Sequence, residues 1–177
     1  MAMRRGGPVP PAVIKYRGIF DFEGLLKLIY DWMIHQDYEV HETKYKHKIP
    51  DPRGAEQELT LRGWRNVNDY VKFWLDIDIH TYDQKDVDVI KEGVKRQMVQ
   101  AKIKILFNPE VELDYTNRFG GSAFLRVLQD FYHKYVIRED IQNYWEDELY
   151  YRTYKLHRLI KEFLDMETKT NASEGRW

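Results

Sequence analysis

The chain has 177 residues, of which 32% are charged and 43% are hydrophobic, a balance typical of one globular domain and not of a disordered chain. Its 28 basic and 29 acidic residues leave a formal net charge of -1, which argues against a protein dedicated to duplex nucleic acid, because such proteins usually carry a basic excess. There are no cysteines, so disulfides, thiol catalysis, cysteine zinc sites and iron–sulfur clusters are excluded.

The first predicted segment is an extended arm over residues 1–12. It contains Pro8, Pro10 and Pro11, and proline favours extended chain over helix. No apolar run follows the two arginines of this arm, so we expect no signal peptide. No stretch approaches 18 continuous apolar residues, so we expect no membrane-spanning helix. A cytoplasmic protein is the simplest expectation, and a component of a virion or appendage would show the same pattern.

A short strand at Val13–Arg17 and a helix ending near His35 follow the arm. Asp21 is suited to cap this helix, because its carboxylate can accept hydrogen bonds from the free N–H groups of the first turn. The apolar side chains of the helix repeat at helical spacing and predict a core face. They are Phe22, Leu25, Leu26, Ile29 and Met33.

Residues 38–48 alternate mostly polar side chains and predict an edge strand. Lys44, Lys46 and Lys48 line one side of it, and lysines on an edge strand commonly prevent edge-to-edge aggregation. Contact with nucleic acid, with Tyr38 or Tyr45 stacking on a base, is the alternative interpretation. The balanced net charge argues against that alternative.

The rest of the chain up to residue 115 is predicted to be a run of antiparallel strands. In residues 69–82 every second residue is apolar, which indicates a strand with one face on a core and the other near water. Glu92-Gly93 predicts a two-residue hairpin turn, and Pro109 is predicted to interrupt the strand before it. The expected strands are 56–64, 69–82, 87–91, 94–107 and 111–115.

Two helices complete the chain, one ending near Val136 and a long one from about Glu139 to Glu167. This order predicts an α+β fold, in which a curved antiparallel sheet of five to six strands has helices packed on one face, including the long C-terminal helix. Residues 13–168 then form one domain and residues 169–177 a polar tail. The element order is similar to that of the helix-grip fold of START-like lipid-binding proteins. This topological likeness implies an apolar cavity between the sheet and the C-terminal helix.

The C-terminal helix is the strongest indication of function. At 100° per residue, the apolar residues near Trp145 form a core stripe. Tyrosine rings and a histidine lie on the opposite side and flank, and tyrosine is enriched at protein interfaces. The alternative is that the arm or a loop covers these rings. The candidate interaction residues are Tyr144, Tyr150, Tyr151, Tyr154 and His157 of the helix and Pro8, Pro10 and Pro11 of the arm.

Arg152 falls near the centre of the core stripe of the same helix. Its guanidinium either extends to solvent or pairs with a carboxylate such as Asp76 or Glu148. Pairing is required if the group is buried, because an unpaired buried guanidinium is very costly.

Asp76, Asp78 and His80 lie on one face of a strand, a pattern that hydrolytic or metal sites can use. No second cluster of ligands accompanies them, and we expect Lys102 and Lys104 on the neighbouring strand to form ion pairs with the two aspartates. A solvated outer face is therefore favoured over a catalytic site.

Two other patterns indicate no site. His41 and His47 are six residues apart, about 20 Å along a strand, so one metal cannot bridge them. Gly120-Gly121-Ser122 lacks the lysine of a phosphate-binding loop and is better explained as a helix cap.

The sequence therefore predicts a non-catalytic protein–protein interaction module, a structural subunit of an oligomer or larger assembly, with no cofactor and no metal. Its partner would be protein, either the same chain or other subunits, and nucleic acid is not expected. The alternative is a protein that binds a small apolar ligand in a helix-grip-like cavity, although the residues concerned also suit a plain core. The cavity candidates are Phe73, Leu75, Ile103, Ile105, Trp145 and Leu149.

Overall fold

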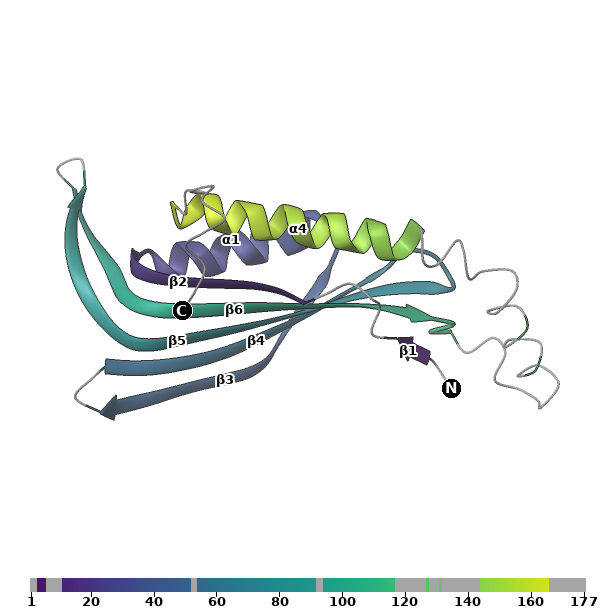
Figure 1. The fold of residues 1–177 in the computed structure, drawn as a ribbon, viewed down its shortest axis with the longest axis horizontal. Helices are drawn as coiled ribbons and strands as arrows, with labels where there is room; N and C mark the ends of the chain where they lie inside the picture. The colour runs from purple at the N-terminus through teal and green to yellow at the C-terminus, as the bar shows by residue number, and fades with distance from the viewer. Residues whose placement is uncertain are drawn as a thin grey trace, which may run out of the picture.

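The computed structural model describes residues 3–5, 11–51, 54–91, 94–116, 127, 131 and 144–165. Within these residues, five long strands and one short strand form an antiparallel sheet, and two helices cover one of its faces (Figure 1). The strands are β1 (Met3–Arg5), β2 (Ala12–Phe20), β3 (Glu39–Asp51), β4 (Gly54–Asn66), β5 (Val71–Lys91) and β6 (Val94–Leu113). The helices are α1 (Phe22–His35) and α4 (Glu146–Phe163). The predicted α+β class is confirmed.

The sheet runs in the order β3, β4, β5, β6, and both β2 and β1 pair with the remaining side of β6. β2 pairs with residues 99–107 of β6 and β1 with residues 111–113. Residues 3–5 of the predicted arm therefore add to the sheet, and β2 and β3 form its two long edges. Pro8 and Pro10, the predicted helix ending near Val136 and the tail 169–177 lie outside the described residues.

α1 forms as the sequence predicts. The Asp21 carboxylate accepts a hydrogen bond from the Gly24 backbone N–H at 2.8 Å, which satisfies one of the free donors of the first turn. Leu25, Ile29 and Met33 are completely buried against the sheet, because their spacing places them on one side of the helix.

The core lies between the sheet and the two helices. The side chains of β5 that face the helices, from Phe73 to Ile79, are at most 2% exposed, as the alternation predicted. From the helices, Leu25 and Ile29 of α1 and Leu156 of α4 enter the same cluster. Neither described helix has the length and continuous hydrophobicity that crossing a membrane requires.

The strands are longer and the sheet flatter than predicted. The segments expected at 69–82 and 87–91 form one strand of 21 residues, β5, which absorbs a register shift between Tyr82 and Lys85. Pro109 does not interrupt β6, because it lies between the stretches that pair with β2 and β1, where its missing N–H breaks no bond to a third strand. The sheet is not strongly curved, and the visible bend lies in the β5–β6 hairpin (Figure 1).

Candidate functional site

The face of α4 that points away from the sheet carries the predicted tyrosines. Tyr151 and Tyr154 of α4 are 64% and 52% exposed and Tyr150 is 37% exposed, and Tyr144, two residues before α4 begins, is 61% exposed. The rings of Tyr150 and Tyr154 lie 5.7 Å apart, and those of Tyr150 and Tyr151 are also 5.7 Å apart. The helix therefore presents a contiguous aromatic surface to solvent.

His157 does not share this exposure, and its predicted place on the exposed face is wrong. It is 7% exposed, and its ring lies 5.9 Å from Phe107 and 5.4 Å from Tyr154. The residue sits on the flank of α4, where a hydrogen bond with the backbone of Val13 ties it to β2. Burial, helped by Lys161, lowers the pKa of His157 below its ordinary value.

Charged side chains continue the exposed face of α4 on both sides of the tyrosines. Asp147 lies in the acidic first turn and Lys161 in the last turn, an arrangement that the helix dipole favours. Arg158 is exposed and pairs with Glu162 at 3.2 Å. The surface therefore has an acidic end, an aromatic centre and a basic end.

Arg152 connects the two helices. It pairs with Glu148 at 2.7 Å and donates to the Gln36 side-chain oxygen at 2.7 Å, just after the end of α1. The predicted pairing with Glu148 is confirmed, and the alternative pairing with Asp76 is wrong because Asp76 lies on the opposite face of the sheet with Arg62 as its partner.

The six residues proposed to line a ligand cavity belong to, or pack against, the hydrophobic core. Among the pockets that the described residues form, none is lined by Phe73, Leu75, Ile105, Trp145 or Leu149. Phe73 packs on Trp145 with their ring centroids 6.1 Å apart. The cavity interpretation stays a prediction without an observation that favours it.

The other face of the sheet carries Asp76, Asp78 and His80, and its carboxylates are already occupied. The Arg62 guanidinium binds Asp76 with both Nε and Nη2, at 2.9 and 2.7 Å. This pairing raises the pKa of Arg62 above its ordinary value, mainly through the hydrogen bond with Asp76.

Asp78 on the same face accepts a hydrogen bond from the Thr60 hydroxyl at 2.7 Å and one from the Asn108 amide at 3.2 Å. His80 lies 3.9 Å from the Glu58 carboxylate, which is too long for a hydrogen bond. Glu58 is instead paired with Lys44 at 2.6 Å, and the Lys44 hydrogen bond lowers the pKa of Glu58. These contacts form a network of hydrogen bonds and ion pairs across the strands of this face.

The predicted ion pairs of Lys102 and Lys104 with the two aspartates are wrong. The register places Lys104 opposite His80 and Lys102 opposite Tyr82, and Lys102 pairs with Asp83 at 2.7 Å. The difference arises because a shared face does not fix which residues lie opposite one another.

Aromatic rings form a row across β3, β4 and β5 on this face of the sheet, which is opposite to the face that α1 and α4 cover. The His41 ring stacks on Trp64 with centroids 4.6 Å apart, and Trp64 lies 5.5 Å from Trp74. The Trp74 indole donates to Glu112 at 2.6 Å. Lys72 lies over Trp74 at 5.6 Å and over the ring of Tyr115 at 4.4 Å.

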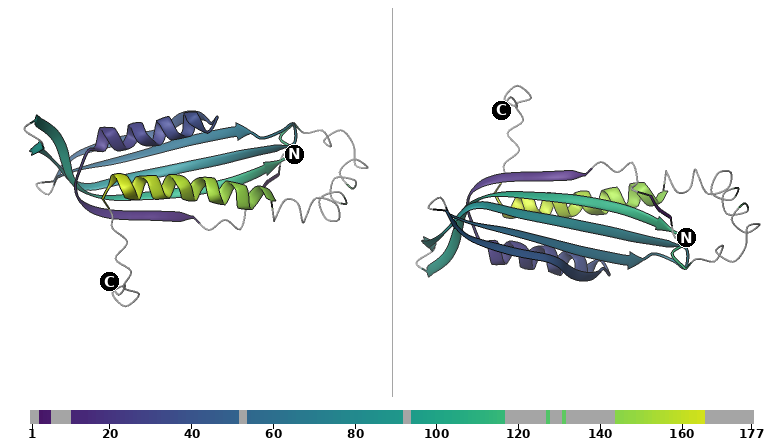
Figure 2. Two further views of the ribbon diagram at one scale, coloured as in Figure 1. Left: turned by 90° about the horizontal axis from the view of Figure 1, so that it is seen from above. Right: turned by 90° about the horizontal axis from the view of Figure 1, so that it is seen from below.

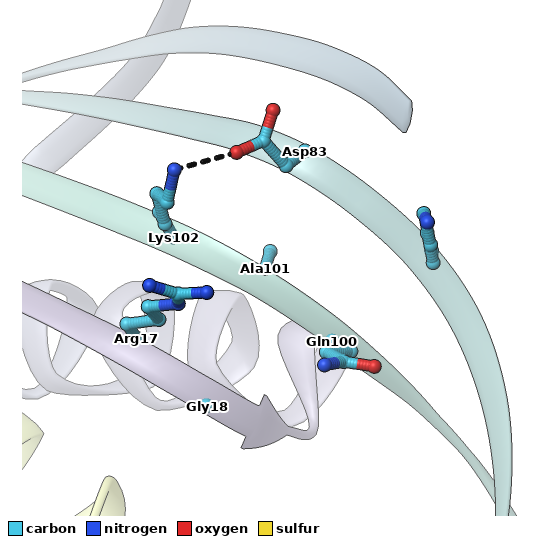
Figure 3. A pocket seen from close by; sticks show the side chains of 7 residues that line it. Arg17, Gly18, Asp83, Gln100, Ala101 and Lys102 are labelled. Atoms are coloured by element: carbon cyan, nitrogen blue, oxygen red, sulfur yellow. Dashed lines mark hydrogen bonds and ion pairs between the residues drawn. The ribbon is translucent and has the colours of Figure 1, made fainter. Parts of the chain in front are cut away.

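A basic cluster that the sequence did not reveal lies where β2 joins β6. The register places Lys15 directly opposite Lys104 and Arg17 directly opposite Lys102. Together with Tyr82, these four cations line a groove of about 380 Å³ on the same face of the sheet as these aromatic rings. An adjacent groove of about 550 Å³ shares Arg17 and Lys102, which lie beside each other in Figure 3. No pattern within β2 or β6 alone signals this pairing.

In the described part of the chain, no three histidine, aspartate or glutamate side chains come close enough to hold a metal ion. A scan against models of protein families finds no match for this chain, and a search of curated proteins finds no significant similarity.

Proposed function

We propose that this chain is a non-catalytic interaction module, and that its partner is a second copy of itself docked through α4. The observation that carries the proposal is the exposed tyrosine surface between charges of opposite sign. Clustered tyrosines at a protein surface favour binding, because the ring contributes a large contact area at a low entropic cost.

The exposed stripe of α4 is complementary to itself. Asp147, Tyr151, Tyr154 and Arg158 lie within about 60° of arc at 100° per residue, directly opposite the buried stripe that contains Leu156. Two antiparallel α4 helices, with a two-fold axis between residues 152 and 153, would align Asp147 with Arg158 of the partner subunit. Tyr151 would then align with Tyr154 of the partner subunit. Such two-fold interfaces are the commonest in homo-oligomers.

The charges at the two ends of this stripe are available for a partner. The Arg158–Glu162 pair is exposed by 73% and 60%, and solvent-exposed pairs at this spacing contribute only about 0.3–0.5 kcal/mol. Asp147 is exposed and has no hydrogen-bond or ion-pair partner among the described residues. Forming two new Asp147–Arg158 pairs across the axis therefore disrupts little within each copy.

The test is native mass spectrometry and light scattering on the full-length protein over a range of concentrations. We expect a dimer of the 21.5 kDa chain. Asp147→Arg and Arg158→Asp each place like charges across the axis, and each should shift the protein to monomer. The double variant, in which both charges are exchanged, should restore the dimer.

Asp31→Arg, a charge reversal at an exposed position of α1, is the matched control and should leave the dimer intact. Thermal melting checks that each variant remains folded. A wild-type monomer at all concentrations, or a dimer that neither single reversal weakens, would contradict the proposal.

A further inference from the structure

Among the described residues, no helix covers one face of the sheet, which we call the open face. α1 and α4 both lie on the same side, and the view from below in Figure 2 shows the strands in front of the helices. On this face the side chains from β2, β5 and β6 include aromatic rings and charges of both signs, and the cations gather where β2 pairs with β6. An antiparallel sheet with helices behind it and rings and cations in front is an arrangement that single-stranded nucleic acid can occupy.

The basic cluster of Lys15, Arg17, Lys102 and Lys104 is electrostatically unfavourable on its own. Like charges directly opposite each other on neighbouring strands are destabilising, and two such pairs lie side by side here. Of the four cations, Lys102 is paired with Asp83 at 2.7 Å. The other three have no carboxylate partner among the described residues. A bound anion would relieve this repulsion.

The lysines of β3 show the contrasting arrangement on the same face. Lys46 lies opposite Glu58 and Lys48 lies opposite Glu56, so each faces a carboxylate of the neighbouring strand. Protection of an exposed edge explains these lysines. It does not explain Lys102 and Lys104, because β6 is an interior strand with partners on both sides.

The groove beside the cluster supplies an aromatic surface as well as charge. Tyr82 lines the groove and lies opposite Lys102 in the sheet. Its ring centroid is 3.8 Å from that of His80, and the two ring planes are tilted by 31°. An aromatic ring bordered by cations combines a stacking surface for a base with contacts for the flanking phosphates.

We infer that the groove along β2 and β6 binds single-stranded nucleic acid, with Lys15, Arg17, Lys102 and Lys104 on phosphates and Tyr82 stacking on a base. The net charge of -1 argues against nucleic-acid binding by the surface as a whole, and the site rests instead on the local cluster of four cations. The net charge also makes the binding weak and sensitive to salt, because the rest of the surface adds no attraction. The inference is independent of self-association through α4, which lies on the other side of the sheet.

The first test measures fluorescence anisotropy of a labelled 12-nucleotide oligouridylate RNA with full-length protein at several salt concentrations. Four phosphate contacts predict a slope of about -3 in log affinity against log salt, at about -0.7 for each contact on a single strand. The double variant Arg17→Ala/Lys104→Ala should halve this slope and weaken binding about tenfold at low salt.

Lys46→Ala/Lys48→Ala is the matched control, since it removes two lysines from the same face that lie opposite glutamates of the neighbouring strand. It should leave both the affinity and the salt slope unchanged. Equal loss in the two double variants, or no salt-dependent binding by the wild type, would overturn the inference.

A second pair of variants separates nucleic acid from other polyanions. Tyr82→Leu should weaken RNA binding about fivefold or more, because it removes the stacking surface, whereas Tyr82→Phe keeps the ring and should bind as the wild type does. Inorganic polyphosphate is the competitor. If polyphosphate displaces the RNA and Tyr82→Leu binds RNA as tightly as the wild type, the groove is a general anion site and the inference is wrong. Circular dichroism confirms the fold of each variant.

Discussion

At the residue scale, Tyr38 places a polar hydroxyl in the buried core. The residue is 4% exposed, and its hydroxyl has no hydrogen-bond partner among the described residues. Burial raises the pKa of Tyr38 to about 12, and the nearby Arg152 and Arg65 oppose the rise only in part. The ring itself packs well, stacked on Trp32 with centroids 6.3 Å apart.

Removing only this hydroxyl should stabilise the protein. We expect Tyr38→Phe to raise the free energy of unfolding by about 1 kcal/mol, because a buried unsatisfied polar group costs about 1–3 kcal/mol. Urea unfolding of the wild type and the variant measures the change. Tyr38→Leu, which also removes the ring from Trp32, is the control and should destabilise. A loss of stability in Tyr38→Phe would show that the hydroxyl has a partner in solution.

His157 gives the fold a dependence on pH. Its pKa is lowered in the folded state, chiefly by burial, so the unfolded chain binds the proton more readily. The contribution of His157 to the free energy of unfolding is therefore largest at neutral pH. It is lost as the pH falls below the unfolded pKa of about 6.5. Protonation places a charge beside Lys161 and the apolar ring of Phe107.

We expect the melting temperature of the wild type to fall more than that of His157→Phe when the pH is lowered from about 7.5 to about 5.5, a range that spans the ordinary histidine pKa. The difference between the two proteins isolates this histidine from the other five. An equal fall in melting temperature for the wild type and His157→Phe would contradict a lowered pKa for His157.

At the element scale, local signals located α1 and the faces of the strands. The Asp21 cap and the spacing of Leu25, Ile29 and Met33 needed only neighbours in sequence, and α1 followed them. The alternation in residues 71–82 correctly separated buried from open side chains. Both signals depend on contacts within a few residues, which sequence patterns record.

Properties that depend on pairing between distant strands were not predictable. The basic cluster exists because β2 pairs with a strand more than 80 residues later in the chain, and no pattern in residues 12–20 encodes that register. His157 was misplaced for a related reason. A helical wheel gives the angle of a side chain but not which strand covers it, and β2 covers this flank of α4.

At the scale of the whole molecule, the two proposed surfaces lie on opposite sides of the sheet. Figure 2 shows α4 in the view from above and the open strands in the view from below. The sheet with its core separates them, and no residue belongs to both surfaces. A dimer formed through α4 would therefore carry two grooves that face away from each other.

This separation predicts that the two activities are independent. Asp147→Arg should be monomeric and should bind the 12-nucleotide RNA with the affinity of the wild type, because a short strand occupies only one groove. Arg17→Ala/Lys104→Ala should lose RNA binding and remain dimeric. Anisotropy and native mass spectrometry on the same samples measure both properties.

If Asp147→Arg weakens binding of the short RNA, the groove depends on the dimer, and the two surfaces are coupled through the sheet or through a partner subunit. If Asp147→Arg abolishes the dimer but Arg17→Ala/Lys104→Ala still binds RNA, only the α4 surface is correctly assigned. The reverse pair of results would support only the groove.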